Sequence, residues 1–168
     1  LVHLFTPRRR RGLRPKDSLV RGYQLLGLVG STRGASFDLE GLRATLHKME
    51  PLALLSRRRR AYMPYLYIEC LLLAITGRHR EVRAKAKLFF EIDARDRLTP
   101  VDVLDRKLLF GAMRFVLATI AMSRQDARCL DDYEVLDRVG DLFAVGSRIG
   151  RCLFYRVRGE ETRARELE

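Results

Sequence analysis

The chain has 168 residues and a mass of 19.5 kDa, the size of one domain with its own hydrophobic core. Apolar residues make up 47% and charged residues 32%, which excludes a disordered acidic tail and a membrane-embedded protein. Lysine and arginine number 33 against 21 acidic residues, giving a net charge of +12. This charge favours an acidic partner, either nucleic acid or an acidic protein surface, although GC-rich codon usage would also explain the excess of arginine over lysine.

The amino-terminal residues 1–18 show no apolar period and contain two prolines, so we expect an extended basic arm. The arginines of this arm can bind an acidic surface, or the arm can be a solvated tail. These arginines are Arg8, Arg9, Arg10 and Arg11. The chain begins with leucine, and residues 7–21 carry only one acid, Asp17. This start fits a chain from which an organellar presequence has been removed, and it fits a shortened basic arm nearly as well.

The next segments predict helices. Residues 19–30 are apolar and helix-like, and Gly34 interrupts them. A second helix is expected over residues 37–49, with Asp38 as its cap and Pro51 at its end or at a kink. Residues 62–76 are apolar almost all round, which predicts a buried helix that Gly77 stops. These stretches show no β alternation.

The carboxyl-terminal half continues the helical pattern. Residues 80–91 predict a helix whose inward side chains are Val82, Ala86, Phe89 and Phe90. Thr99 and Pro100 signal the start of a helix that runs to about residue 122. Its inward face is expected to hold Val101, Leu104, Leu108, Ala112 and Phe115.

After that helix, residues 130–132 open another, with Leu136, Val139 and Phe143 expected inward. Residues 149–157 are expected to continue it or to form a last short helix. Residues 159–168 are charged in both signs, and we expect them to fray. The acids Asp131 and Asp132 are expected to cap the helix start rather than to bind a metal.

An internal repeat is the strongest architectural signal. Gly34 and Gly77 lie 43 residues apart, and the same shift places apolar positions on apolar positions. A third unit over residues 108–143 has the same order, with Ser123 and Arg124 where a glycine is expected. Because such helical hairpins must stack to bury their faces, the sequence predicts an all-α, short solenoid of two to three stacked hairpins. It would span residues 19–157, between the arm 1–18 and a charged tail 158–168; a plain helical bundle is the alternative.

Residues that could form disulfides, bind a metal or catalyse a reaction are scattered along the sequence. Cys70, Cys129 and Cys152 are far apart in apolar runs, so we expect small core residues in a reducing compartment rather than disulfides or a zinc site. No nucleotide-binding, zinc-hydrolase or nucleophile motif occurs. We therefore predict no catalytic, cofactor-binding or metal-binding residues, and an enzyme is the least favoured class. Glu69 is expected to pair with an arginine.

One of the two longest apolar segments contains Pro64 and Glu69, and the other contains Arg114. Both are shorter than a membrane-spanning helix. No membrane span is expected. Both segments therefore predict buried helices of a protein core.

The densest charge is a run of four arginines followed by tyrosines. The residues are Arg57, Arg58, Arg59 and Arg60, then Tyr62, Tyr65 and Tyr67. Arginine and tyrosine are common anchors of protein interfaces, and the pair also suits phosphate contacts and base stacking. A solvated connector followed by core tyrosines is the third interpretation.

Residues 67–78, YIECLLLAITGR, followed by AKLFFE at 86–91 and TPVD at 99–102, resemble a pentatricopeptide repeat. Residues 23–34 with 46–49 resemble the same unit. Pentatricopeptide proteins are helical solenoids that usually bind single-stranded RNA, but their polar base-reading positions correspond here to Tyr67 or Ile68 and to Gln24 or Leu25.

In length, repeat type and arginine content the chain also resembles a pentatricopeptide-like accessory subunit of the mitochondrial ATP synthase F1 head. The resemblance therefore implies a non-catalytic subunit in the mitochondrial matrix, on the matrix side of the inner membrane. Its partner would belong to a large assembly, with the F1 α-type subunit as the first expectation. The alternative is an organellar RNA-binding or mitoribosomal protein.

Overall fold

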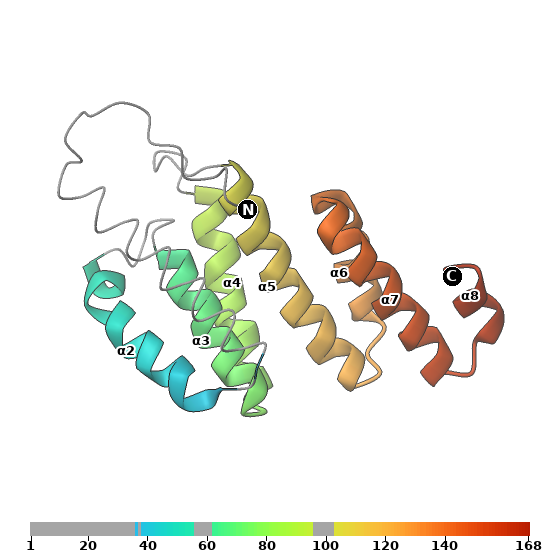
Figure 1. The fold of residues 1–168 in the computed structure, drawn as a ribbon, viewed down its shortest axis with the longest axis horizontal. Helices are drawn as coiled ribbons and strands as arrows, with labels where there is room; N and C mark the ends of the chain where they lie inside the picture. Colours follow the sequence, from blue (N-terminus) through green and yellow to red (C-terminus); the bar gives the residue numbers. More distant parts are fainter. Residues whose placement is uncertain (1–35, 37, 56–61, 96–102) are drawn as a thin grey trace.

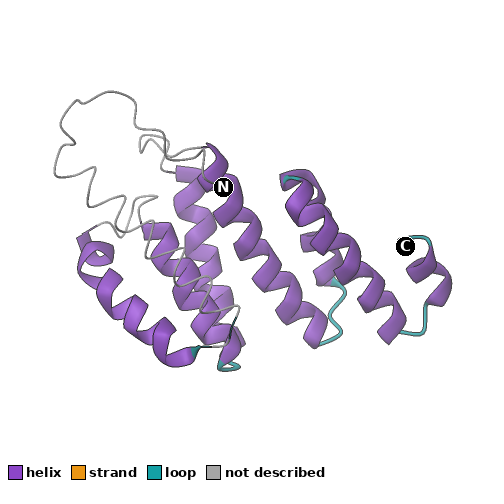
Figure 2. Cartoon of the chain, viewed as in Figure 1, coloured by secondary structure: helices purple, strands orange, loops and turns teal. Residues whose placement is uncertain are grey.

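The computed structural model describes residues 36, 38–55, 62–95 and 103–168, and this part of the chain is all-α, without strands (Figure 2). The seven helices are α2 (Leu39–Leu55), α3 (Met63–Ile75), α4 (His79–Arg95), α5 (Val103–Ser123), α6 (Arg128–Val139), α7 (Asp141–Val157) and α8 (Glu161–Arg165). The predicted all-α class is confirmed. The predicted arm 1–18, the apolar stretch 19–30 and the helix start at residues 99–102 lie outside the described residues.

The helices follow one another across the molecule from α2 to α8 (Figure 1). Short turns join α3 to α4, α5 to α6 and α7 to α8, and the members of each pair pack on one another. The first helix of each pair also contacts the first helix of the next, so α5 touches both α3 and α7. Among the described helices, none combines the length and the apolar character needed to cross a membrane.

The three helices α3, α5 and α7 end in the same backbone turn. The residue after each helix cap has a left-handed conformation, with φ of 76° at Gly77, 53° at Gln125 and 74° at Gly159. The next N–H then donates to the carbonyl five residues earlier, which is the Schellman geometry. These bonds are Arg78 to Leu73 at 2.8 Å, Asp126 to Ala121 at 2.9 Å and Glu160 to Tyr155 at 2.9 Å. Gly77 thus ends α3 as predicted, and in the next hairpin Gln125 stands where the sequence pattern expected Ser123 or Arg124.

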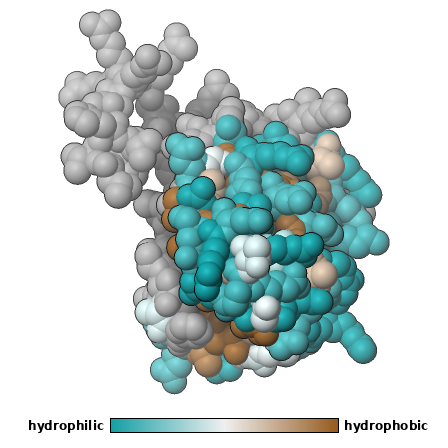
Figure 3. Space-filling model, turned by 90° about the vertical axis from the view of Figure 1, so that its right-hand side faces the viewer, coloured by the Kyte–Doolittle hydropathy of each residue, from teal (hydrophilic) through white to brown (hydrophobic). Residues whose placement is uncertain are grey.

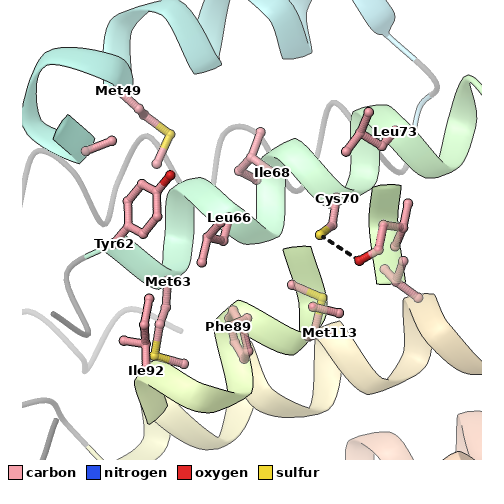
Figure 4. Close-up of a cluster of buried hydrophobic side chains, with 14 of the residues drawn as sticks. Met49, Tyr62, Met63, Leu66, Ile68, Cys70, Leu73, Phe89, Ile92 and Met113 are labelled. Carbon is pink, nitrogen blue, oxygen red and sulfur yellow. Dashed lines mark hydrogen bonds between the residues drawn. The ribbon is translucent and has the colours of Figure 1, made fainter. Parts of the chain in front are cut away.

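A first hydrophobic cluster fills the space between α2, α3, α4 and α5 (Figure 4). Its fully buried members include Leu42, Met49, Leu66, Ile68, Val82, Phe89 and Met113. The inward positions predicted for α4 are confirmed for Val82, Ala86 and Phe89, whereas Phe90 is half-buried. Cys70 lies in this cluster, where its thiol donates to the Val82 carbonyl at 3.9 Å, and burial raises its pKa to about 12.

A second cluster joins α5, α6 and α7. Its buried members are Ala118, Ala121, Cys129, Tyr133, Leu136 and Phe154. Cys70 and Cys129 are buried free thiols, as predicted, and Cys152 is half-buried. The second cluster explains why α5 is apolar on several sides, since α5 packs against a hairpin on each flank.

The predicted inward face of α5 is wrong. Leu108 and Phe115 remain 38% and 40% exposed, and Ala112 is half-buried. The buried side chains are instead Met113, Val116, Ala118, Ile120 and Ala121. Because apolar residues cover most of this helix, periodicity alone does not indicate which stripe is left open. The side chains of Val101 and Leu104 lie outside the description.

Three boundaries also differ from prediction. Pro51 does not end α2, which continues to Leu55; the alternative of a kink at Pro51 stays a prediction. Gly140, with φ of 156°, separates α6 from α7, so residues 130–143 are not one helix; Leu136 is fully buried, whereas Val139 and Phe143 are half-buried. Residues 141–157 form one long helix. The tail does not fray over residues 161–165, because α8 buries Ala164 and its neighbours form ion pairs with Glu160.

Candidate protein-binding face

One side of α7 is held tightly against α6. The ring of Tyr133 lies so close to Gly150 that a Cβ there would come within 2.2 Å of it. The Ser147 hydroxyl donates to the Tyr133 carbonyl at 2.8 Å, and Phe154 completes the contact. These residues fix the rotation of α7 about its axis, and they therefore decide which of its side chains stay open.

The open side of α7 carries a ridge of aliphatic residues. Val145 is 63% exposed, Ile149 56%, Leu153 46% and Val157 66%. Residues four apart lie on neighbouring turns of one helix face, so the four side chains form a continuous stripe about 18 Å long. We call these four residues the α7 ridge. Exposed aliphatic side chains in a row at this spacing mark an interaction surface more often than scattered ones do.

The open stripe of α5 lies next to the ridge. A Cβ at Gly146 of α7 would lie 3.2 Å from the ring of Phe115, and a Cβ at Gly111 of α5 would lie 2.4 Å from the ring of Phe143. The two glycines therefore allow α5 and α7 to approach closely. Phe115, which is partly exposed, extends the apolar surface from α7 onto α5.

Cations border the ridge. Arg156 pairs with Glu168, and Arg151 pairs with Asp137 at 2.7 Å. Arg148 is exposed and has no ion-pair partner among the residues that the structure describes. Apart from Asp141 at its amino-terminal end, α7 carries no acid. The carboxyl-terminal end of the stack, seen in Figure 3, is largely hydrophilic, with hydrophobic atoms gathered mainly toward its lower and left margins.

The two arginines of α5 are engaged between helices. Arg106 of α5 makes two hydrogen bonds of 2.8 Å to Asp93 of α4, whose side chain is buried. Arg114 of α5 donates to Asp132 of α6 at 2.7 Å and lies over the ring of Phe90, 4.4 Å from its centroid. Burial raises the pKa of Asp132, and Arg114 opposes this shift. These pairs join α5 to α4 on one flank and to α6 on the other.

Charge is distributed unevenly along the chain. The described residues contain 20 of the 33 basic and 18 of the 21 acidic side chains, a net charge of +2. The other residues carry 13 basic and three acidic side chains, a net charge of +10. The helical stack is therefore almost neutral, and its most distinctive surface is apolar.

Most of the predicted binding residues lie outside the described part of the chain. These are Arg8, Arg9, Arg10 and Arg11, and Arg57, Arg58, Arg59 and Arg60. Tyr62 is only 8% exposed and belongs to the first hydrophobic cluster (Figure 4). Its ring stacks on that of half-buried Tyr65 with centroids 5.5 Å apart, so neither residue lies on the α7 ridge.

Two polar residues adopt roles other than those predicted. Glu69 pairs with Lys85 at 2.8 Å rather than with an arginine. The cap position of α6 is Ala127, and not Asp131 or Asp132. One residue earlier, the Asp126 carboxylate accepts the Arg128 N–H at 3.1 Å. The Arg128 side chain lowers the pKa of Asp126 to about 2. The prediction placed the cap too late because α6 begins before residue 130.

Sequence reasoning missed the α7 ridge, although the four-residue spacing of Val145, Ile149, Leu153 and Val157 was visible. A stripe at this spacing is equally typical of a buried helix face, and only the contacts at Ser147 and Gly150 show which side is covered.

Within the described ranges, no group of three histidine, cysteine or acidic side chains is placed to hold a metal ion. Comparisons with protein-family models, curated proteins and solved structures return no match.

Proposed function

We propose that this chain is a non-catalytic accessory subunit that binds another protein through the α7 ridge and the adjoining part of α5. The observation that carries the proposal is the exposure of Val145, Ile149, Leu153 and Val157 on a helix whose opposite side is locked in the core. Leaving four aliphatic side chains in water forgoes stabilisation that a partner's surface would provide.

The architecture supports this role. Three pairs of helices repeat the same left-handed turn at Gly77, Gln125 and Gly159, and the first helices of the pairs contact one another in order. This pattern favours a short solenoid of stacked hairpins, the arrangement that pentatricopeptide-like proteins share. Solenoids of this kind present extended surfaces formed by one helix of each repeat, and the exposed parts of α5 and α7 belong to such a surface.

The resemblance to pentatricopeptide-like subunits makes a large mitochondrial assembly the first partner to test. Within it we propose the ATP synthase F1 head, with its α-type subunit, on the matrix side of the inner membrane. The arginine-rich residues 8–11 and 57–60 would add attraction to an acidic surface of that assembly, because each segment carries four positive charges.

Native purification of the tagged full-length chain from its own cells, followed by mass spectrometry, tests the proposal. We expect a defined protein complex that survives nuclease treatment. The variant Ile149→Gln should lose the partner, whereas Leu88→Gln, at a partly exposed leucine of α4, should retain it. Recovery of the intact complex with Ile149→Gln would refute the role of the ridge.

The RNA-binding alternative makes the opposite prediction. RNA and ribosomal proteins would be recovered and would be lost on nuclease treatment. The affinity for single-stranded RNA would then fall steeply with salt, with a log–log slope of about −0.7 per phosphate contact. That result would replace the accessory-subunit proposal.

A further inference from the structure

We propose that the occupant of the α7 ridge is an acidic amphipathic helix of another protein. This inference rests on the proposed function and names the chemistry of the partner segment. Its starting point is the shape of the surface, an aliphatic stripe that winds gradually along α7 and is adjoined by Phe115 of α5.

The shape favours a helix as the occupant. The ridge spans Val145 to Val157, about 18 Å, which corresponds to little more than three turns of a facing helix. Helices in contact interdigitate side chains spaced three and four residues apart, and the ridge presents that spacing. A β-strand would find no free backbone donors or acceptors there, because the N–H and C=O groups along a helix bond within it.

The charges favour acidic residues beside the partner's apolar stripe. The α7 helix carries Arg148, Arg151 and Arg156 against the single acid Asp141. Arg151 and Arg156 are held by Asp137 and Glu168, and Arg148 is exposed without a partner among the described residues. A glutamate or aspartate flanking the partner's stripe can therefore pair with Arg148 at the rim of the contact.

The same charges disfavour two other occupants. A second copy of this chain would place Arg148 of both copies at one interface, and each copy carries a net charge of +12. Single-stranded RNA binds on aromatic stacking platforms beside cations, whereas the ridge consists of two valines, an isoleucine and a leucine. An acidic helix satisfies both the apolar and the charged features of this face.

Two synthetic peptides test the inference with the full-length chain. Each is a 21-residue helix with leucines on one face; one carries glutamates beside the leucines and the other carries lysines at the same positions. Fluorescence anisotropy should show binding of the glutamate peptide and binding at least about ten-fold weaker for the lysine peptide. Equal binding of the two peptides, or no binding of either, would overturn the assignment of an acidic helix.

Variants locate the binding on the molecule. Ile149→Gln should weaken the glutamate peptide at least about thirty-fold, since a central anchor of an interface is lost, and the matched Leu88→Gln on α4 should leave it unchanged. Both positions are exposed, so thermal unfolding should show intact folds, and Val157→Gln provides a second ridge variant. Unchanged peptide binding in both ridge variants would reject this site.

Two further results separate the possible failures. Sedimentation that shows a dimer of the chain, abolished by Ile149→Gln, would identify a second copy as the occupant and overturn the inference. A native protein complex without peptide binding would keep the proposed function and reject the acidic helix. Peptide binding without any native protein partner would keep the binding chemistry of the face and reject the accessory-subunit role.

Discussion

Replacing Arg114 by methionine should destabilise the stack strongly, because this side chain connects three helices. Its guanidinium donates to Asp132 of α6 at 2.7 Å and lies 4.4 Å from the ring centroid of Phe90 on α4 and 5.5 Å from that of Phe110. A hydrogen bond to a charged partner contributes about 1.5–3 kcal/mol, and each cation–π contact adds about 0.5–1 kcal/mol. Methionine keeps the aliphatic stem but none of these contacts.

We therefore expect Arg114→Met to lower the free energy of unfolding by about 3 kcal/mol. For a chain of this size the corresponding fall in Tm is about 6–12 °C. Urea and thermal unfolding followed by circular dichroism measure both quantities. A loss below about 1 kcal/mol would contradict the reasoning, since it would place Arg114 among surface ion pairs of little consequence.

The pH dependence of this variant provides a second test. Burial already raises the pKa of Asp132 and Arg114 opposes the shift, so the pKa should rise further in Arg114→Met. A carboxyl whose folded pKa lies above its unfolded value favours the folded state when protonated. The deficit of the variant should therefore shrink as the pH falls through the folded pKa toward the unfolded value. In the double variant Arg114→Met/Asp132→Leu the loss of unfolding free energy at pH 7 should also be smaller, because no buried charge is left unpaired. A double variant as unstable as Arg114→Met would contradict this account.

Three further predictions concern the turns and helix contacts. Gly150→Ala should lower stability by about 1–2 kcal/mol, because the clash of the new methyl group with the Tyr133 ring costs more than the gain in helix propensity. Gly146→Ala meets only the movable Phe115 ring, so it should be neutral or stabilising. Equal effects of the two substitutions in urea unfolding would refute this distinction. Gln125→Gly should raise stability by about 1 kcal/mol, since it relieves a left-handed conformation, and a lower Tm would count against this. Asp126 has a pKa lowered to about 2, so its contribution is complete above pH 4 and lost as the pH falls to about 2; Asp126→Asn should flatten stability over that range, and an unchanged acid profile would contradict it.

The helices were predictable from the sequence to the extent that local patterns determine them. The amphipathic pattern of α4 places Val82, Ala86 and Phe89 inward, and the structure agrees. Gly77 marks the end of α3 because glycine adopts a left-handed conformation at little cost. Gln125 makes the same turn, but glutamine carries no such signal, so the matching position of the second hairpin was not identified.

The candidate face was not predictable because it depends on contacts between helices. The stripe of Leu108, Ala112 and Phe115 on α5 was expected to be buried, and it is the part of α5 that remains most open. The α5 helix packs against α3 and α4 on one side and against α6 and α7 on the other. A third apolar stripe on this helix therefore has no further helix to cover it. Which stripe is left over is decided by the packing of Met113 and Ala118 against opposite neighbours.

The high arginine content has two separable consequences for function. Within the described helices, Arg106, Arg114 and Arg151 are joined to acids of neighbouring helices, so they contribute to holding the stack together rather than to attracting a partner. A net charge of +2 over this part of the chain gives little long-range steering, whereas the remaining residues carry +10. Under the proposed function, we therefore assign attraction to an acidic assembly mainly to those remaining residues and specific docking to the α7 ridge. Added salt should slow association, by screening the charge of the remaining residues, far more than it speeds dissociation from the apolar α7 ridge.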